Sequence, residues 1–498
     1  MKNIKAYIIL IAVTTLSGCS DYLDINRDPS LPQEATAQVL LPPMFQEMVA
    51  GEAFDSRFIG KYVQNWSQVT AGDIWDAHGY NSGSDNGGQM WRSHYWAIGT
   101  NVDLLIKEAQ SSQKWWYIGA AKAIRAWSWQ TTTDYHGEII LKEAWEPNRF
   151  VFDYDNQEDV YAEVRRVAAE AMEYLDKEDA TNTFSLGDIV YKGDRNKWKK
   201  FVNAILARNA HHISNKSTYD ADLVIQLVDQ SFTGNADNFN VPHVATTSSD
   251  ANFYGPLRAN LGSFRQTSFV ISLLNGSVLG GAADPRLPLM FTASPDGTFR
   301  GVNPTVGDPN NVVGNVQRIP NLWGTLGNTS TTGKYIFQDK ADFPLITYAE
   351  LQFIKAEAAF IKGNKTMALE AYKKGIEAHM DFALVSAVNK ASYMASAAVA
   401  QSEGELTISD IMLQKYIALY GHGCLETWVD LMRHHYNSAI YTGFTLPSVF
   451  YTDNNGKPAY RVRPRYNSEY VWNRESLDKI GGTNVDYHTY EQWFSKPE

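Results

Sequence analysis

Cysteine is scarce in this sequence: the 498 residues contain two, Cys19 and Cys424, so a disulfide framework cannot hold the fold together. Positive charge is not in excess either, because 44 Lys and Arg stand against 55 Asp and Glu and give a formal net charge of −11. Proteins that neutralise nucleic-acid phosphates are usually basic, so the composition argues against a nucleic-acid partner. After the N-terminal region, no stretch approaches the roughly 18 apolar residues of a membrane-spanning helix.

Catalytic and metal-binding motifs are missing as well. The sequence holds no HExxH, no G-x-S-x-G and no GxGxxG. The pairs His211-His212 and His434-His435 consist of adjacent residues, which on a helix point about 100° apart and chelate poorly. The acidic run at 153–159 lacks the glycine that a calcium loop needs at its sixth position. We therefore assign no catalytic residue, no metal ligand and no cofactor, and the sequence leaves open whether calcium assists binding.

The N-terminus has the pattern of an exported lipoprotein. Lys2 and Lys5 precede an unbroken apolar run at 6–13, which is too short to span a bilayer. The run leads to Leu-Ser-Gly and then Cys19, which matches a bacterial lipobox, where the cysteine after the cleavage site is acylated. Acyl chains on Cys19 would anchor the protein to a membrane without crossing it.

These features divide the chain into three parts. We expect a signal peptide at 1–18, then the lipidated cysteine and a flexible leash at 19–36, and a single domain at 37–498. The leash is polar and contains two prolines, which is typical of an extended tether.

Within the domain, apolar periodicity predicts mainly α-helices. Helix pairs are expected at 94–134, 157–213, 348–380 and 408–433. Thr347 and Glu350 have the spacing of a capping box, and Gly363-Asn364 predicts the end of the helix that starts there. The next helix has small residues where the second helix of a tetratricopeptide repeat has them, and four such pairs are enough to stack into a scaffold.

The region at 231–345 is different, because Gly, Pro, Asn, Ser and Thr dominate it. It predicts irregular structure with short strands near 298–300 and 335–337. Long loops in a compact protein are often functional, and the interleaved aromatics favour an ordered ligand region. The expected fold is therefore all-α dominated, a tetratricopeptide-like helix-pair scaffold with a large irregular loop-rich region and few short strands.

Aromatic residues are abundant, with 14 Trp and 27 Tyr. The rings in segment 64–90 stand among Gly, Asn, Asp and Ser, with no apparent apolar face on which to bury them. Rigid aromatic planes beside amides and carboxylates suit carbohydrate, whose C–H faces stack on an indole and whose hydroxyls bind polar groups. We assign five ligand-binding residues on this basis: Trp66, Trp75, Tyr80, Tyr254 and Trp323.

Two alternatives accompany this assignment. The tryptophans of 64–90, like Trp323 and Tyr254, could instead pin their loops to the helical body, and the sequence does not decide between these interpretations. The tryptophans on the periodic helices are expected in the core: Trp96, Trp116, Trp127 and Trp129.

Taken together and in order, several motifs resemble those of the SusD/RagB-type nutrient-binding outer-membrane lipoproteins. Behind the lipobox comes an acidic start at 20–24, followed by helix and exit-turn segments, an Asp-Pro-Arg segment, the 343–358 repeat, an E-x-W-x-D-x-x-R run and a closing segment. The matching residues lie at 117–123, 134–139, 283–287 with the turn at 297–301, 343–358, 426–433 and 463–473. Asn467 stands where the family usually has proline, so the closing segment matches more loosely. Within the E-x-W-x-D-x-x-R run we expect Trp428, Asp430 and Arg433 to be structural.

The resemblance implies a non-catalytic lipoprotein of the outer membrane, facing the cell exterior, that covers a SusC-type TonB-dependent transporter and delivers captured nutrient to it. It further implies that the ligand site lies on the irregular surface and that the repeats face the transporter. An oligosaccharide is the expected ligand. A peptide ligand stays open, and a third alternative is an all-helical toroid glycosidase, which would need two carboxylates facing each other across a cleft.

Overall fold

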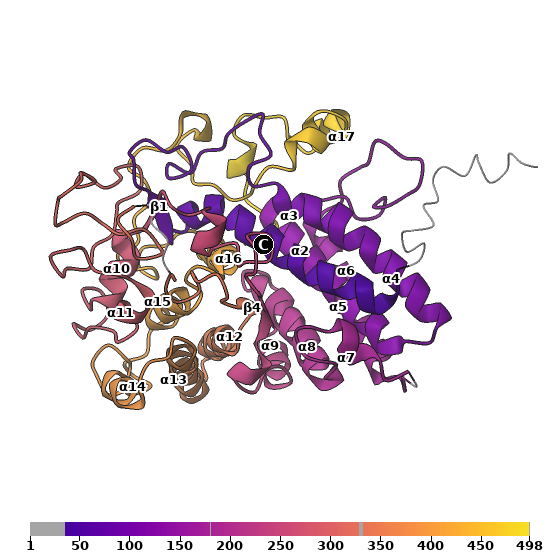
Figure 1. Ribbon diagram of the computed structural model, residues 1–498, viewed down its shortest axis with the longest axis horizontal. Helices are drawn as coiled ribbons and strands as arrows, with labels where there is room; N and C mark the ends of the chain where they lie inside the picture. The colour runs from indigo at the N-terminus through magenta and orange to yellow at the C-terminus, as the bar shows by residue number, and fades with distance from the viewer. Residues whose placement is uncertain (1–34, 180, 328–331, 498) are drawn as a thin grey trace, which may run out of the picture.

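The computed structural model describes residues 35–179, 181–327 and 332–497, and helices dominate this part of the chain (Figure 1). The predicted signal peptide, the lipidated Cys19 and nearly all of the leash lie outside the described residues. The long helices are α2 (Ala37–Tyr62), α4 (Gly99–Ser111), α5 (Trp115–His136), α6 (Gln157–Asp176), α8 (Arg195–His212), α12 (Tyr348–Lys362), α13 (Lys365–Phe382), α15 (Ile408–Ala418) and α16 (Cys424–Arg433). The shorter helices are α3 (Gln89–Arg92), α7 (Phe184–Gly187), α9 (Ala221–Asp229), α10 (Ser268–Leu274), α11 (Leu287–Met290), α14 (Ala387–Met394) and α17 (Arg474–Lys479), with π-helical turns η1 (Ser93–Ile98) and η5 (Tyr466–Tyr470).

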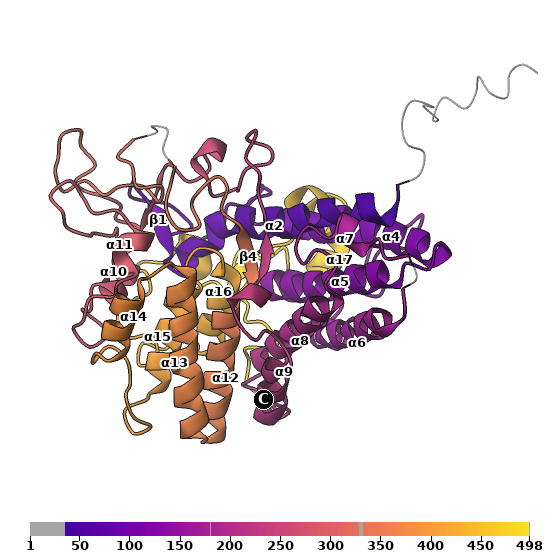
Figure 2. The same cartoon turned by 60° about the horizontal axis from the view of Figure 1, so that its bottom comes forward.

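Helices are present at all four predicted pairs, and in the first three pairs the two helices pack against each other, whereas α15 packs mainly on α12 and α13, and α16 on α2. Contacts join α4 to α5, α6 to α8 and α12 to α13, while α5 also packs along α6. In Figure 2, α2 and α5 run horizontally, whereas α12 and α13 run down the page below the loop-rich region. The all-α dominated, helix-pair fold is therefore confirmed.

Local sequence signals explain the α12–α13 hairpin. The Thr347 side chain accepts a hydrogen bond from the Glu350 backbone and starts α12. Gly363 ends it in the left-handed conformation (φ +85°), and the Asn364 side chain caps the start of α13. At Gly375, a Cβ atom would lie 2.8 Å from the Phe353 ring, so glycine allows the two helices their close approach.

Four short strands make two antiparallel ribbons that join segments distant in the sequence. Strand β1 (Trp66–Gln68) pairs with β3 (Phe264–Gln266), so that Trp66 lies opposite Gln266. Strand β2 (Phe239–Val241) pairs with β4 (Phe343–Ile346), with an irregularity after Phe239. The strands predicted near 298–300 and 335–337 are wrong, because these residues form turns and irregular backbone.

The loop-rich region around α10 and α11 lies at one end of the molecule, and the C-terminal segment with α17 lies along an edge above α2 and α3 (Figure 1). None of the helices in the described part of the chain combines the length and the apolar character of a bilayer-spanning segment.

Candidate functional site

The five residues assigned to ligand binding from the sequence all lie in the interior. Their side chains are 5% exposed or less: Trp66, Trp75, Tyr80, Tyr254 and Trp323. The expectation that segment 64–90 has no apolar face for its rings is therefore wrong. The alternative, in which these rings pin loops to the helical body, describes the structure.

Long-range pairing explains this burial. The β1–β3 ribbon brings Trp66 against Phe264 in a stacked arrangement, with ring centroids 6.5 Å apart, and Tyr254 packs edge-on at 5.8 Å. The Trp323 indole donates a hydrogen bond to the Tyr254 carbonyl at 2.7 Å. Trp75 lies among Tyr80 and two aromatic side chains of α2. These partners come from distant segments, so the local sequence does not reveal them. Among the five residues, Tyr80 still lines a cavity, described below.

Trp96 shows the opposite error. It lies in a predicted helix and was expected in the core, as Trp127 and Trp129 are, yet 61% of Trp96 is exposed. Trp116 is half-buried. Trp96 belongs to η1, and the Arg92 guanidinium lies 4.4 Å from the centre of its ring.

Trp96 borders a cavity of about 350 Å³, which we call the aromatic cleft. It lies between η1, the 140–152 loop and the segment that contains η5. Its rings are Trp91, Tyr95, Trp96, Trp145 and Phe152. Ordered aromatic walls with a polar rim are typical of small-ligand sites. The cleft is thus our candidate ligand site.

Trp145, which lines the cleft, has an uncommon backbone conformation. Its backbone is left-handed (φ +62°), and its indole donates a hydrogen bond to the Tyr95 carbonyl at 2.7 Å. The ring lies so close to Gly99 that a Cβ atom there would be 2.1 Å from it. Gly99, at the start of α4, therefore makes room for the indole.

The polar members of the cleft supply hydrogen-bonding groups of both kinds. Arg92 and Arg465 provide donors at the rim, and Ser468 provides a hydroxyl. Glu469 is buried and accepts hydrogen bonds from the Tyr154 hydroxyl at 2.6 Å and the Asn473 amide at 2.9 Å. Burial raises the pKa of Glu469 above its usual value.

A second, smaller cavity of about 180 Å³, the tyrosine pocket, lies on the other side of the same segment. Tyr80, Arg463, Tyr466 and Tyr470 line it, whereas Arg465, Ser468 and Glu469 face the aromatic cleft. Residues 463–470 are thus a wall shared by both cavities. The Asn467 backbone N–H donates to Asp85 at 3.0 Å and fixes this wall to the 64–90 segment, which the proline usual in the family could not do.

The sequence carried no signal that distinguishes these site residues. Trp96 has the same helical spacing as the buried tryptophans, and Tyr466 lies in a polar C-terminal segment without periodicity. In the sequence the closing segment stands out only by its family motif, and its position between two cavities becomes visible only in three dimensions.

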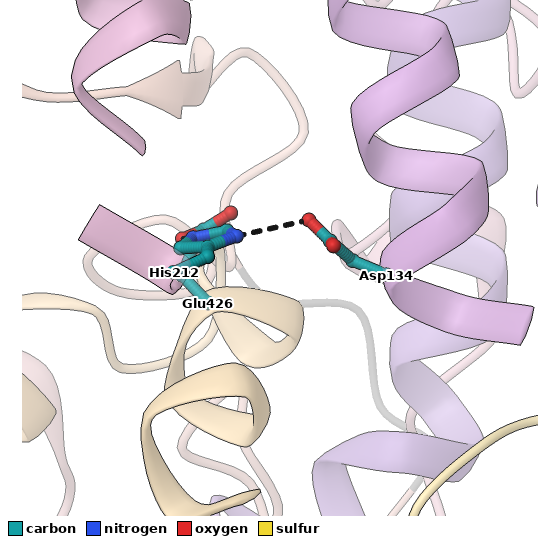
Figure 3. A group of neighbouring side chains, drawn as sticks. All are labelled: Asp134, His212 and Glu426. Atoms are coloured by element: carbon teal, nitrogen blue, oxygen red, sulfur yellow. Dashed lines mark hydrogen bonds and ion pairs between the residues drawn. The ribbon is translucent and has the colours of Figure 1, made fainter. Parts of the chain in front are cut away.

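Asp134, His212 and Glu426 form a buried group of metal-ligand types (Figure 3). None of the three lines either cavity. His212 bridges two acids: its Nδ1 is 3.2 Å from Asp134 and its Nε2 is 2.9 Å from Glu426. Each ring nitrogen of His212 therefore faces one carboxylate, and one ligand atom from each of the three residues lies within 4.8 Å of the other two. Burial lowers the pKa of His212, but Glu426 and Asp134 outweigh it and raise the pKa to about 9. This arrangement is that of an imidazolium held between two carboxylates.

Residues of two other motifs that resemble those of the family form buried contacts that hold the helices together. Arg433 is fully buried and forms ion pairs with Glu357 of α12 at 2.9 Å and Asp430 at 2.6 Å. The Trp428 indole donates to the Tyr436 hydroxyl at 2.8 Å. These contacts agree with the structural role expected for Trp428, Asp430 and Arg433. Arg286 pairs with Asp284 at 2.6 Å with neither side chain exposed.

The sequence matches the family model SusD-like_2, described as "Starch-binding associating with outer membrane", over residues 29–463. The chain belongs to the SusD-like family. Among curated proteins, none matches the sequence.

Solved SusD-like structures share the whole fold. A SusD homologue from Bacteroides fragilis is 20% identical with a TM-score of 0.71, and the match covers 93% of this chain and 100% of that one. A chitin-binding SusD homologue from Flavobacterium johnsoniae is 19% identical with a TM-score of 0.72, covering 93% and 99%. A further chitin-binding protein is 22% identical with a TM-score of 0.65, covering 91% and 99%. At these identities the likeness establishes the fold of this SusD-like protein.

Proposed function

We propose that this SusD-like protein is a non-catalytic, lipid-anchored binding protein that captures an oligosaccharide in the aromatic cleft and delivers it to a SusC-type TonB-dependent transporter. The supporting observation is the exposed Trp96 ring beside a cavity of about 350 Å³ with donors and an acceptor at its rim. An indole plane can stack on a sugar face while the rim binds hydroxyls. The family description and the chitin-binding relatives point to the same ligand class.

The composition of the cleft favours binding over hydrolysis. A glycosidase needs two carboxyl groups about 5–10 Å apart on either side of the scissile bond. Glu469 is the one acid among the residues that line the cleft, and its carboxylate is occupied by Tyr154 and Asn473. The site therefore lacks the second acid that the glycosidase alternative requires.

Calorimetry with a panel of chito-, malto- and xylo-oligosaccharides tests the binding step. We expect at least one to bind, and Trp96→Ala to weaken that binding by about tenfold or more, since stacking on an aromatic ring contributes on the order of 1–2 kcal/mol. Trp472→Ala is the matched control, because Trp472 is 75% exposed and lines neither cavity.

Two results would count against the proposal. If no saccharide binds but a peptide library does, the cargo is peptide. If saccharides bind and Trp96→Ala behaves like Trp472→Ala, the cleft is not the site. Delivery is tested separately, by affinity purification of the tagged lipoprotein from membranes and identification of a co-purifying TonB-dependent transporter.

A further inference from the structure

The tyrosine pocket contains a buried positive charge without a carboxylate partner. Arg463 is 7% exposed, and its guanidinium donates to the Asn484 carbonyl at 3.0 Å, to the Val485 carbonyl, and to the Tyr470 hydroxyl at 3.4 Å. Its Nε atom has no hydrogen-bond partner among the described residues. In the described ranges, no Asp or Glu lies within ion-pair distance of it.

This situation is unusual within the molecule. Of the other buried arginines that the structure describes, four form ion pairs with carboxylates: Arg208, Arg286, Arg433 and Arg461. The fifth, Arg265, donates to three backbone carbonyls and lines neither cavity. Burying a charge without a counter-charge is costly, so an unpaired guanidinium at a cavity indicates where an anion would be stabilised.

The rest of the pocket wall supports this charge. Arg474, at the start of α17, is exposed, lines the same pocket and has no ion pair with any residue in the described part of the chain. Asp453 is the one acid of the lining, so two arginines face one carboxylate. The rings of Tyr466 and Tyr470 are stacked, with centroids 5.6 Å apart and planes at 15°, and they offer a flat apolar surface beside the charges. The pocket is thus locally basic although the chain as a whole is acidic.

We propose that the tyrosine pocket is an anion subsite, which receives the carboxylate or sulfate of an acidic sugar whose neighbouring units lie in the aromatic cleft. This inference rests on the proposed function and specifies its ligand class. Both cavities are lined by residues of the same wall at 463–470, and the proposal requires one oligosaccharide to extend across that wall. Arg474 binds the anion directly, because the planar guanidinium matches the geometry of carboxylate and sulfate oxygens. Arg463 adds a fixed charge behind it.

Matched probes isolate the charge. An oligogalacturonide and its methyl ester differ only in the carboxylate, and a sulfated galactan oligosaccharide and its desulfated form differ only in the sulfate. We expect one charged member to bind at least about tenfold more tightly than its neutral partner in calorimetry, with the difference shrinking at high salt. Preference for the uronate or for the sulfate identifies the anion.

Arg474→Ala is the decisive variant, because an exposed side chain without an ion pair can be removed without disturbing the fold. It should remove the preference for the charged probe and leave the neutral probe unaffected. Arg166→Ala on α6 changes the net charge equally at an exposed position that belongs to neither lining, so it should have no effect. Arg463→Lys, checked for folding by its melting temperature, should weaken the preference in part.

The outcomes separate this inference from the proposed function. If neutral saccharides bind and the charged and neutral members of both pairs bind equally, the anion subsite is excluded while the proposed function stands. The same holds if Arg166→Ala and Arg474→Ala reduce binding equally, since the effect is then one of overall charge. If no saccharide of any kind binds, the proposed function itself fails.

Discussion

Trp66 and Trp96 carry the same side chain in opposite surroundings. Trp66 lies among rings from the 231–345 region and has no exposed surface, whereas Trp96 presents most of its indole to solvent. Burial of the Trp66 ring thus stabilises the fold, whereas the exposed Trp96 ring can be buried only when a ligand covers it.

Trp66→Ala should therefore lower the free energy of unfolding by about 3–5 kcal/mol, because it leaves a large cavity between β1 and β3. Chemical denaturation followed by circular dichroism measures this. Trp472→Ala, at an exposed site, should change stability by no more than about 0.5 kcal/mol. Equal effects of the two substitutions would contradict the burial of Trp66.

Gly99→Ala tests the packing under the cleft. The new methyl group would collide with the Trp145 ring, so we expect about 1–3 kcal/mol of destabilisation and weaker saccharide binding, as the ring is displaced from the cleft. Gly404→Ala is the control, because nothing lies within 4 Å of the added atom there. A variant that binds and unfolds like the wild type would show that Trp145 does not need this space.

At the scale of elements, local sequence signals predict those features that are determined by residues close together in the chain. The start of α12 at Thr347, its end at Gly363 and the hairpin with α13 follow from capping and helix periodicity. The two ribbons could not be predicted, because β1 meets β3 almost 200 residues later in the sequence and the strands have only three or four residues each. The burial of the five rings assigned from the sequence could not be predicted for the same reason, because those ribbons decide which rings are covered. The wall at 463–470 likewise becomes visible only where residues distant in the sequence line the same two cavities.

Charged contacts between helices give a pH dependence. His212 on α8 joins Asp134 on α5 to Glu426 on α16, and its pKa of about 9 exceeds the value of 6.5 for a free histidine. A raised folded-state pKa gives stability that is complete below pH 6.5 and is lost as the pH rises through 9.

The stability advantage of the wild type over His212→Gln should consequently shrink by about 3 kcal/mol between pH 6 and pH 10. Denaturant titrations across this range measure it. His435→Gln is the matched control, because it removes a partly exposed histidine that pairs with Glu491 and has no contact with the Asp134–His212–Glu426 group. An advantage that stays constant with pH would mean that His212 is not held as an imidazolium.

At the scale of the whole molecule, the proposed function requires attachment to the outer membrane. Cys19→Ser should move the protein from the membrane fraction to the soluble fraction, because it removes the site of acylation while leaving the folded region unchanged. Fractionation with immunoblotting measures this, and protease treatment of intact cells reports whether the wild type faces the exterior. A wild-type protein that is already soluble would contradict the lipid anchor.

The wall between the two cavities also restricts which mutations can change the ligand specificity of such a protein. Side chains from one short stretch, 463–470, serve two compartments according to which way each residue points. Replacing Arg465 changes the lining of the aromatic cleft alone, and replacing Tyr466 changes the lining of the tyrosine pocket alone. Inserting or deleting a single residue would instead turn every later side chain of η5 about the helix axis and disturb the linings of both cavities at once. Point substitutions in 463–470 can therefore change the specificity of one cavity, whereas insertions or deletions there would disturb both.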